Sequence, residues 1–180
     1  MSQGQETKCY LIQSQRGWGF FSLRSAGIFS LEIPILTRAE AITKACDRGP
    51  LSPLAESSEA KRIATLIDKY FRGYKVSFDE VRIDFSERTP FQQRAYRELM
   101  TVKYGVTITY GMLAEKMKAK GAARAIGQAM SKNRIPIIVP CHRVLSSGNK
   151  LTGFSATGGI PTKKWLLAHE VAYTESPPYC

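Results

Sequence analysis

The hydrophobic pattern of this chain changes near residue 88, and that change constrains the fold more than any other feature. Before it, short segments with loosely alternating apolar and aromatic residues predict strands at 8–14, 17–23 and 26–34. After it, apolar residues recur at helical spacing behind capping residues, which indicates one helix after another. We therefore expect an α/β (α+β) fold, with a small mixed strand and helix domain over residues 1–84 and a helical domain over residues 85–180.

Two helices and a further strand are expected in the first half. Residues 37–49 begin with the capping residue Thr37 and stop at a glycine, and residues 58–73 carry apolar residues at helical spacing and also stop at a glycine. The alternating segment VRIDF at 81–85 predicts one more short strand.

The second half opens with a helix start, because the capping residue Thr89 is followed by Pro90 in the first turn. Thr109 is a cap for the next helix, and a basic turn leads into a further short helix over 122–133. Two short helices joined by a glycine-containing turn in a basic chain predict a helix-turn-helix.

The chain carries a net charge of +11, with a sequence pI near 9.7. Such a surplus is typical of proteins with a polyanionic partner, either nucleic acid or an acidic membrane face, although a merely soluble basic protein is the alternative. No apolar run is long enough for a transmembrane helix, so we expect no membrane partner. The N-terminus lacks a basic region followed by an apolar one, so we expect a protein that is not secreted and acts in the cytoplasm, or in the nucleus of a eukaryote.

The four cysteines, Cys9, Cys46, Cys141 and Cys180, form no C-x-x-C pair, and the chain has two histidines. This composition argues against a structural zinc site, and we expect no metal. A disulfide between Cys9 and Cys46 remains open at this point, because intracellular disulfides occur in hyperthermophiles.

The segment IPIIVPCHRVL at 135–145 is the strongest candidate for chemistry. Two prolines stiffen an apolar run that leads to Cys141, and His142 and Arg143 follow at once. A thiolate is a far better nucleophile than a thiol, and a nearby base or cation raises the ionised fraction. Direct contact of Cys141 with His142 needs a turn or a bridging water, because neighbours on an extended strand point to opposite faces. Glu170 is the best downstream candidate to orient the histidine. The alternative is a buried structural cysteine.

The second helix of the helix-turn-helix is unusual for a reader of base sequence. Its segment GAARAIG presents Arg124 among small residues, Ala122, Ala123 and Gly127. Readers of the major groove present several polar side chains to base edges. Small residues around one arginine instead allow close approach to a duplex while the arginine enters the groove or the stack, unless Arg124 is only a solvated side chain.

These segments together resemble one known family. PCHRV, preceded by ARAIGQAMSKN and followed by LTGFSATGG and WLLAHE, is similar to the O6-alkylguanine-DNA alkyltransferases, the methylated-DNA–protein-cysteine methyltransferases. The resemblance covers roughly residues 68–171. It implies a winged, helical C-terminal domain that repairs duplex DNA containing alkylated guanine, without a cofactor and as a monomer. Each molecule would act once, because the product thioether has no easy reverse route; activity on O4-alkylthymine is left open.

The resemblance also implies roles for individual residues. Cys141 would accept the alkyl group, and His142 would act through a water with Glu170 behind it. Arg124 would take the place of an extruded nucleotide. Tyr110 would crowd the target phosphate and form a hydrogen bond with the flipped base. The remaining implied site residues are Asn133, which joins the helix to the cysteine segment, Val144 and Ser155, whose backbone groups read the guanine edge, and Phe154 in the pocket.

The sequence differs from the family pattern at three places. Arg134 follows Asn133 where a proline is usual, Phe154 stands where tyrosine is usual, and the 153–159 loop is about two residues longer. Two other classes of function are compatible with parts of the sequence. A lesion-sensing binding module would keep the helix-turn-helix but lack the acceptor cysteine, and a Cys–His hydrolase would leave the net charge and the Arg124 segment unexplained.

Overall fold

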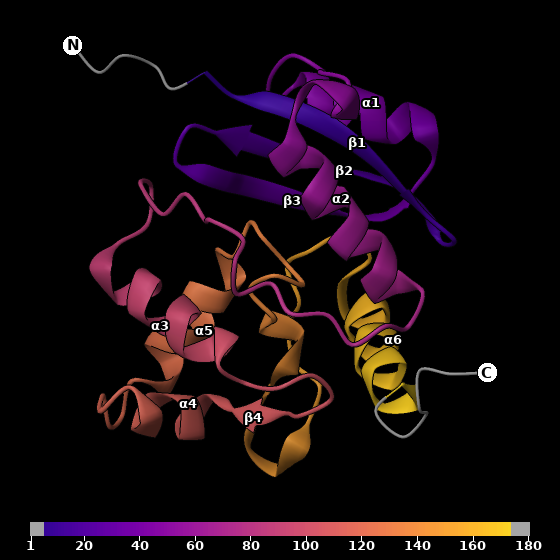
Figure 1. Cartoon of the computed structure of the whole chain (residues 1–180). Helices are drawn as coiled ribbons and strands as arrows, with labels where there is room; N and C mark the ends of the chain where they lie inside the picture. Colours follow the sequence, from indigo (N-terminus) through magenta and orange to yellow (C-terminus); the bar gives the residue numbers. More distant parts are fainter. Residues whose placement is uncertain (1–5, 174–180) are drawn as a thin grey trace. The chain divides into compact units, whose positions relative to one another are not determined.

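The computed structural model describes residues 6–173 and shows a chain with a small sheet in its N-terminal part and helices in its C-terminal part (Figure 1). The chain divides into two compact units, Met1–Phe85 and Ser86–Cys180. The expected mixed α/β fold is confirmed. None of the helices between residues 6 and 173 is both long enough and apolar enough to cross a membrane.

The first unit contains a three-stranded antiparallel sheet in the order β1 (Lys8–Ser14), β2 (Gly17–Arg24) and β3 (Gly27–Leu36). All three strands were expected from the alternation of their residues. The register of β2 and β3 shifts between Trp18 and Phe20. Gly19 lies at this bulge, where a Cβ atom would collide with the Glu32 carbonyl oxygen, so only glycine allows the two strands to approach so closely.

Two helices pack against this sheet. The first, α1 (Arg38–Cys46), begins with a capping box in which Thr37 and Glu40 each bind the other's backbone amide, and it contacts β1 and β2. A single 3-10 turn, η1 (Leu54–Glu56), precedes α2 (Ser58–Phe71), which buries Ile63, Ile67 and Tyr70 and contacts β1. The cap at Thr37 and the stop at Gly49 therefore identified the first helix in the sequence, and the helical spacing of apolar residues identified the second.

The strand expected at 81–85 was wrong. This segment makes a single bridge, between Ile83 and Ile28 at the start of β3. Two backbone hydrogen bonds flank it, from the Ile28 amide to the Arg82 carbonyl and from the Asp84 amide to the Ile28 carbonyl. The pairing stops after this one bridge because turns at residues 79–80 and 86–87 leave only a short extended stretch between them.

A disulfide between Cys9 and Cys46 does not form, because both cysteines are free thiols. Cys9 is fully buried with Phe20 and Ala45 in the core between the sheet and α1, whereas Cys46 is exposed at the end of that helix. Burial raises the pKa of the Cys9 thiol to about 11, so Cys9 is a small apolar core residue. Cys180 lies outside the described residues.

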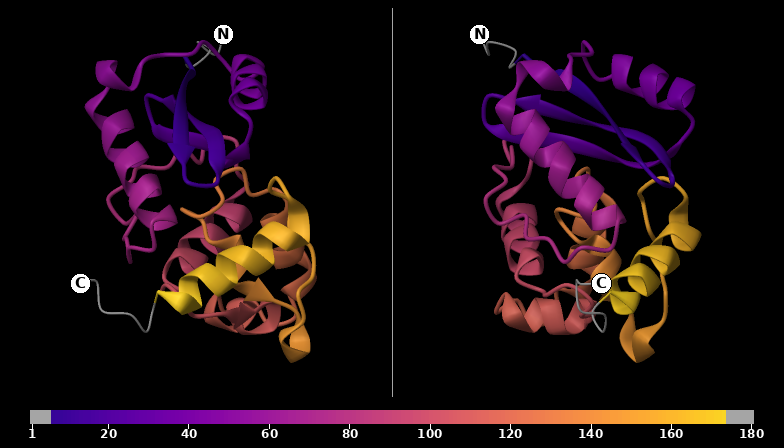
Figure 2. Two further views of the ribbon diagram at one scale, coloured as in Figure 1. Left: turned by 90° about the vertical axis from the view of Figure 1, so that its right-hand side faces the viewer. Right: turned by 45° about the vertical axis from the view of Figure 1, so that its right-hand side comes forward.

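The second unit is built from helices joined by turns. They are α3 (Pro90–Met100), α4 (Tyr110–Lys116), α5 (Ala123–Ser131) and α6 (Gly159–Ala172), with the short 3-10 segments η2 (Cys141–Arg143) and η3 (Ser147–Asn149) between the last two. Thr89 and Thr109 cap α3 and α4 as expected. Both α3 and α4 contact α5, and α6 contacts η2. Figure 2 shows α6, in yellow, running along one side of this unit.

A two-residue parallel ladder fixes the centre of the second unit. The strand β4 (Ile108–Thr109) pairs with β5 (Val144–Leu145), so that Ile108 faces Val144. The residue after β4 is Tyr110, and the η2 turn with Cys141 ends directly before β5. The ladder therefore brings Tyr110 and Cys141, 31 positions apart in the sequence, to the same region.

Candidate active site

The segment before Cys141 is a buried, tightly turned stretch of backbone. Ile138 donates its amide hydrogen to the Pro136 carbonyl at 2.9 Å, and the residue between them, Ile137, has a φ of 74°. A β-branched residue in this left-handed region is strained and persists only where its surroundings hold it. Ile137 is 1% exposed, so packing supplies that restraint. A second turn follows, because the Cys141 amide donates to the Val139 carbonyl at 2.8 Å.

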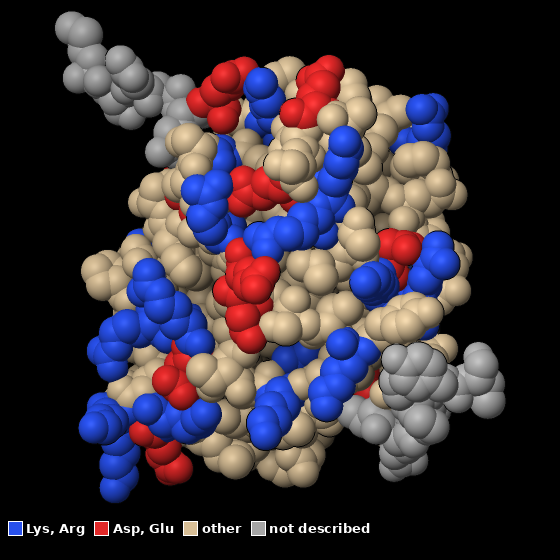
Figure 3. All heavy atoms as spheres, in the orientation of Figure 1, with Lys and Arg blue, Asp and Glu red and all other residues tan. Residues whose placement is uncertain are grey.

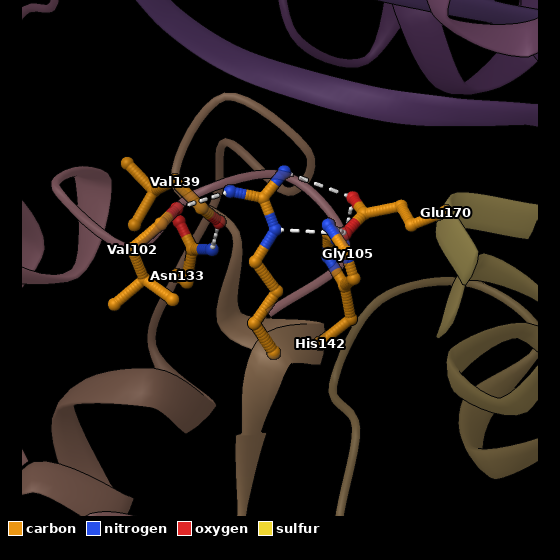
Figure 4. Close-up of polar contacts among 7 residues, drawn as sticks. Val102, Gly105, Asn133, Val139, His142 and Glu170 are labelled. Atoms are coloured by element: carbon orange, nitrogen blue, oxygen red, sulfur yellow. Dashed lines mark hydrogen bonds and ion pairs between the residues drawn. The ribbon is translucent and has the colours of Figure 1, made fainter. Parts of the chain in front are cut away.

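Asn133 connects this segment to the cysteine. Its Nδ2 atom donates to the Val139 carbonyl at 2.8 Å and lies 3.1 Å from Cys141 Sγ, and its Oδ1 atom accepts the Ile135 amide hydrogen at 3.0 Å (Figure 4 shows Asn133 with Val139). A donor aimed at the sulfur favours the thiolate over the thiol. One buried amide side chain therefore holds the turn and also stabilises negative charge on the sulfur.

His142 turns to Glu170 on α6, as Figure 4 shows, and Arg143 binds the same carboxylate. His142 Nε2 lies 2.7 Å from Glu170 Oε1, Arg143 contacts both carboxylate oxygens at 2.9 Å through Nε and Nη2, and the Gly105 amide donates to Oε2 at 3.0 Å. Both His142 and Glu170 are completely buried. The structure thus brings together the predicted pair His142 and Glu170, and it adds two partners that the sequence did not reveal.

The charges in this cluster follow from those contacts. Burial by itself raises the pKa of Glu170, but the hydrogen bonds and positive charge at His142 and Arg143 outweigh it and hold that pKa well below its usual range. Burial lowers the pKa of His142, so the imidazole is neutral at neutral pH. The 2.7 Å contact with a carboxylate assigns the ring proton to Nε2 and leaves Nδ1 as an acceptor. That Nδ1 atom is buried without a hydrogen-bond partner in the part of the chain that is described.

The sequence suggested Arg143 as the cation that favours the Cys141 thiolate, and this interpretation was wrong. Arg143 follows Cys141 closely in the chain, but the η2 turn sends the guanidinium to Glu170 and to the Val102 carbonyl at 2.6 Å. Burial raises the pKa of the Cys141 thiol; the Asn133 hydrogen bond and the positive charge of Lys163 act in the opposite direction. Lys163 was missed, although its spacing from Leu166 and Glu170 in the sequence places all three on one buried face of α6.

A pocket of about 230 Å³ opens over the sulfur. It brings together five of the predicted site residues and three others, and its lining consists of Tyr110, Gly127, Met130, Ser131, Cys141, Gly153, Phe154 and Ser155. Burial raises the pKa of the Tyr110 hydroxyl, which also forms a hydrogen bond with the Thr152 side chain. Cys141 therefore lies at the wall of a mostly apolar pocket that also presents a protonated phenol.

The other predicted site residues lie outside the lining. Val144 is completely buried in β5. Ala122 and Ala123 form the cap and first residue of α5, and Arg124 is exposed on the first turn of that helix. Because Gly127 lines the pocket and Arg124 lies one turn earlier on α5, the helix connects the pocket to the surface.

The surplus of positive charge belongs mainly to the second unit. Residues 86–180 contain 14 Lys and Arg against 5 Asp and Glu, so nine of the eleven net charges lie there. In Figure 3, Lys and Arg side chains gather at the lower left of the visible face, where α3 and α4 lie, with a few acidic side chains among them. Such a distribution suits a polyanionic ligand bound by this unit. Within residues 6–173, no group of three or more His, Cys, Asp or Glu side chains could hold a metal ion.

Comparisons with known proteins point to one family. The family model described as "6-O-methylguanine DNA methyltransferase, DNA binding domain" matches residues 90–172. A methylated-DNA–protein-cysteine methyltransferase of Mycobacterium leprae is 38% identical over 136 residues, which are 76% of this chain and 80% of that protein. Its counterpart in Mycobacterium bovis is 47% identical over 104 residues, which are 58% of this chain and 61% of that protein.

Solved structures agree over nearly the whole chain. The crystal structure of Mycobacterium tuberculosis O6-methylguanine methyltransferase has a TM-score of 0.76 and 33% sequence identity, and the match covers 96% of each chain. The structure of Mycobacterium tuberculosis OGT in complex with DNA has a TM-score of 0.75 and 33% identity, covering 92% of this chain and 94% of that one.

Proposed function

Because this chain belongs to the methylated-DNA–protein-cysteine methyltransferase family, we propose that it repairs O6-alkylguanine in duplex DNA by moving the alkyl group irreversibly to its own Cys141. The observation that carries this proposal is the position of the Cys141 sulfur, which lines a pocket while Asn133 donates a hydrogen bond to it. The similarity to the solved Mycobacterium tuberculosis O6-methylguanine methyltransferase covers 96% of this chain, so it includes the N-terminal unit as well.

The transfer requires that the Cys141 thiol loses its proton and that the departing guanine gains a proton or a hydrogen bond. In the resting protein Cys141 is a thiol, because burial raises its pKa. Its proton passes through a water to His142 Nδ1, the acceptor left free when Nε2–H binds Glu170. The thiolate sulfur then attacks the alkyl carbon, the bond from that carbon to guanine O6 breaks, and the purine leaves with the electron pair.

Tyr110 is suited to supply the second proton or hydrogen bond. Its hydroxyl lines the same pocket as Cys141, and burial raises its pKa, so it is a protonated donor at neutral pH. The departing guanine oxygen gains negative charge in the transition state, and a positioned donor stabilises that charge. The backbone of Val144 and Ser155, and the ring of Phe154, complete the surroundings of the base in this proposal.

The target oxygen lies inside a duplex, so the nucleotide must leave the stack before it reaches the pocket. Arg124 is exposed at the start of α5 and would fill the gap, while the small residues Ala122, Ala123 and Gly127 allow the helix to approach the backbone closely. In this proposal α4 and α5 form a winged helix-turn-helix, and the domain over residues 85–180 carries both DNA binding and chemistry. One monomer acts on one lesion, in the compartment that holds the DNA.

The experiment measures transfer of a labelled methyl group from an O6-methylguanine duplex to protein, followed by the mass of the peptide that contains Cys141. We expect one methyl group per molecule, located on Cys141, and no transfer to the Cys141→Ser variant, because a serine hydroxyl is scarcely ionised at neutral pH. Cys46→Ser is the matched control, since this cysteine is exposed and lies in the other unit.

Three outcomes contradict the proposal. Label on the Cys141→Ser protein means that another residue is the acceptor. Release of label into solution over several turnovers means that the site is a hydrolase, whereas tight binding without any transfer means a lesion-binding module.

A further inference from the structure

Arg134 is the exposed residue directly after Asn133, and the steps described above make no use of it. It stands where a proline is usual in the family pattern, so the chain there lacks the restriction on backbone rotation that a proline supplies. The side chain forms an ion pair instead, because Arg134 Nη1 lies 3.1 Å from Glu87 Oε2. The two side chains are 46% and 47% exposed, and the contact joins segments that are 47 positions apart in the sequence.

The segment that begins with Arg134 carries the candidate acceptor. The buried Asn133 before it binds the Ile135 amide through Oδ1 at 3.0 Å and lies 3.1 Å from Cys141 Sγ through Nδ2. Ile137 in the same segment has a φ of 74°, a strained value for a β-branched residue. A strained segment keeps its conformation only where contacts hold it. Asn133 supplies such contacts in the interior, and Arg134 supplies one at the surface.

The other partner of the ion pair is attached to the start of a helix. Glu87 precedes α3, and the cap of that helix, Thr89, forms a capping box. The Gln93 side chain also donates to the Arg88 carbonyl at 3.1 Å. The backbone around Glu87 is therefore fixed to α3, so its carboxylate holds Arg134 against the start of this helix.

A second contact joins α3 to the end of α5. Tyr96, buried on α3, donates its hydroxyl hydrogen to the Ala129 carbonyl in the last turns of α5 at 2.8 Å. Burial raises the pKa of Tyr96 to about 12; the charge of Cys141 adds to the rise, and that of Arg134 acts in the opposite direction. Tyr96 therefore lies within electrostatic reach of both groups. The chain is thus held on both sides of Asn133 by α3 and the residues that lead into it.

The exposure of the ion pair sets the size of its effect. A solvent-exposed pair contributes little to the free energy of unfolding of a whole protein, and salt screens it. A local opening that breaks this contact and leaves the rest of the unit folded still loses the full contribution of the pair. We therefore expect the pair to restrain residues 134–141 locally, with little effect on global stability.

We propose that Glu87 and Arg134 are positioning residues, whose ion pair holds the 134–141 segment so that Cys141 stays aligned in its pocket. The assignment rests on the proposed function in that it takes Cys141 as the acceptor. It also gives the transfer step a dependence on ionic strength that is separate from DNA binding, because salt weakens the pair even when the protein is saturated with DNA.

The test follows amide hydrogen exchange of Ile135, Val139 and Cys141 by NMR, without any DNA. These amides donate to Asn133 Oδ1, to the Ile135 carbonyl and to the Val139 carbonyl, respectively. Their exchange therefore reports local opening of the segment.

Four variants isolate the ion pair. Arg134→Gln and Glu87→Gln each remove one charge, and the double variant removes both. Glu87→Arg combined with Arg134→Glu restores the pair with its charges exchanged. The matched control is Arg62→Gln, which removes another exposed pair, with Glu80 at 2.9 Å in the other unit.

We expect each single variant to raise the exchange rates of the three amides about threefold in about 0.01 M salt, within the range that exposed ion pairs give. The double variant should change them no more than either single variant, and the exchanged pair should return them towards the wild type. Raising the salt concentration to about 1 M should produce a similar rise in the wild type and none in the double variant. Arg62→Gln should leave the three amides unchanged.

Methyl transfer provides the functional measurement. The reaction needs the sulfur in line with the alkyl carbon, and a wider spread of sulfur positions makes that geometry rarer. The transfer rate at saturating O6-methylguanine duplex should therefore fall about threefold in Arg134→Gln and in Glu87→Gln, and the exchanged pair should restore it.

Unchanged amide exchange in the single variants, or single effects that add up in the double variant, overturns the proposal. Faster exchange with an unchanged transfer rate at saturating duplex also overturns it, because the pair then holds the segment without positioning Cys141. Absence of methyl transfer in the wild type would instead reject the proposed function, while the exchange data would still decide whether the pair restrains the segment.

Discussion

The side-chain amide of Asn133 donates to the sulfur of Cys141 at 3.1 Å. The same nitrogen binds the Val139 carbonyl, and the amide oxygen binds the Ile135 backbone, so one residue fixes both ends of the strained segment that precedes the nucleophile. Geometry and electrostatics at the sulfur are therefore set by the same side chain.

Asn133→Ala should lower the free energy of unfolding by about 2 kcal/mol, because it leaves the buried Ile135 amide without its partner and removes one of the two hydrogen bonds to the Val139 carbonyl. It should also slow methyl transfer, since the sulfur loses a hydrogen-bond donor. Urea unfolding and the transfer rate measure the two effects. Gln128→Ala, at an exposed position on α5, should change neither by a comparable amount. Equal effects of the two substitutions would show that the amide contacts do not hold the segment.

Glu170→Gln should destabilise the protein by about 3 kcal/mol at pH 7, because it leaves the buried Arg143 guanidinium without its counter-charge. The pKa of Glu170 is lowered in the folded protein, so the unfolded chain takes up this proton first as the pH falls. The stability that the carboxylate contributes is therefore fully present above about pH 4.3, the value for an unfolded glutamate, and is lost as the pH falls towards the lowered folded value.

The measurement for Glu170 is urea unfolding of the wild type and the variant between pH 7 and pH 3. The difference between them should stay constant down to about pH 5 and shrink below pH 4. Glu115→Gln, at an exposed position on α4, is the control and should change stability by no more than about 0.5 kcal/mol. A difference that grows in acid would mean that the sign of the Glu170 shift is wrong.

Arg124→Ala should slow repair of an alkylated duplex strongly while the reaction with the free base O6-benzylguanine, if the pocket admits it, stays near normal. The reason is that Arg124 is exposed on α5 and acts only when there is a stack to fill. A loss of about 1.4 kcal/mol in the flipping equilibrium slows transfer tenfold when a slower chemical step follows. The ratio of the two second-order rates measures this, with Lys132→Ala as a control for the loss of one basic charge. An unchanged ratio in the Arg124 variant rejects its role in extrusion.

Binding to undamaged duplexes should depend strongly on salt and little on sequence. Nine of the eleven net charges lie in the second unit, and α5 presents small residues in place of a set of base-reading side chains. Each phosphate that the protein neutralises adds roughly −0.9 to the slope of log K against log salt concentration. Binding isotherms measured at salt concentrations between about 50 and 200 mM provide the test. A flat response, or preference for one undamaged sequence, contradicts it.

The sequence by itself determined the parts of this protein that depend on neighbours along the chain. Thr37, Thr89 and Thr109 cap the helices expected of them, because a cap binds a backbone amide two or three residues away. The three strands of the sheet follow from alternation over a few residues. The PCHRV motif predicts Cys141 as the acceptor from five neighbouring positions, and the structure places Cys141 in the lining of the pocket.

The tertiary structure decided everything that depends on partners distant in the sequence. The 81–85 segment forms one bridge, to Ile28 in β3, in place of a strand. Arg143 follows Cys141 closely in the chain, yet its charge goes to Glu170, 27 positions away. Lys163, 22 positions from Cys141 in the sequence, brings its charge to the sulfur. Coulombic interactions and burial act through space, so the order of residues along the chain could not show which cation acts on Cys141.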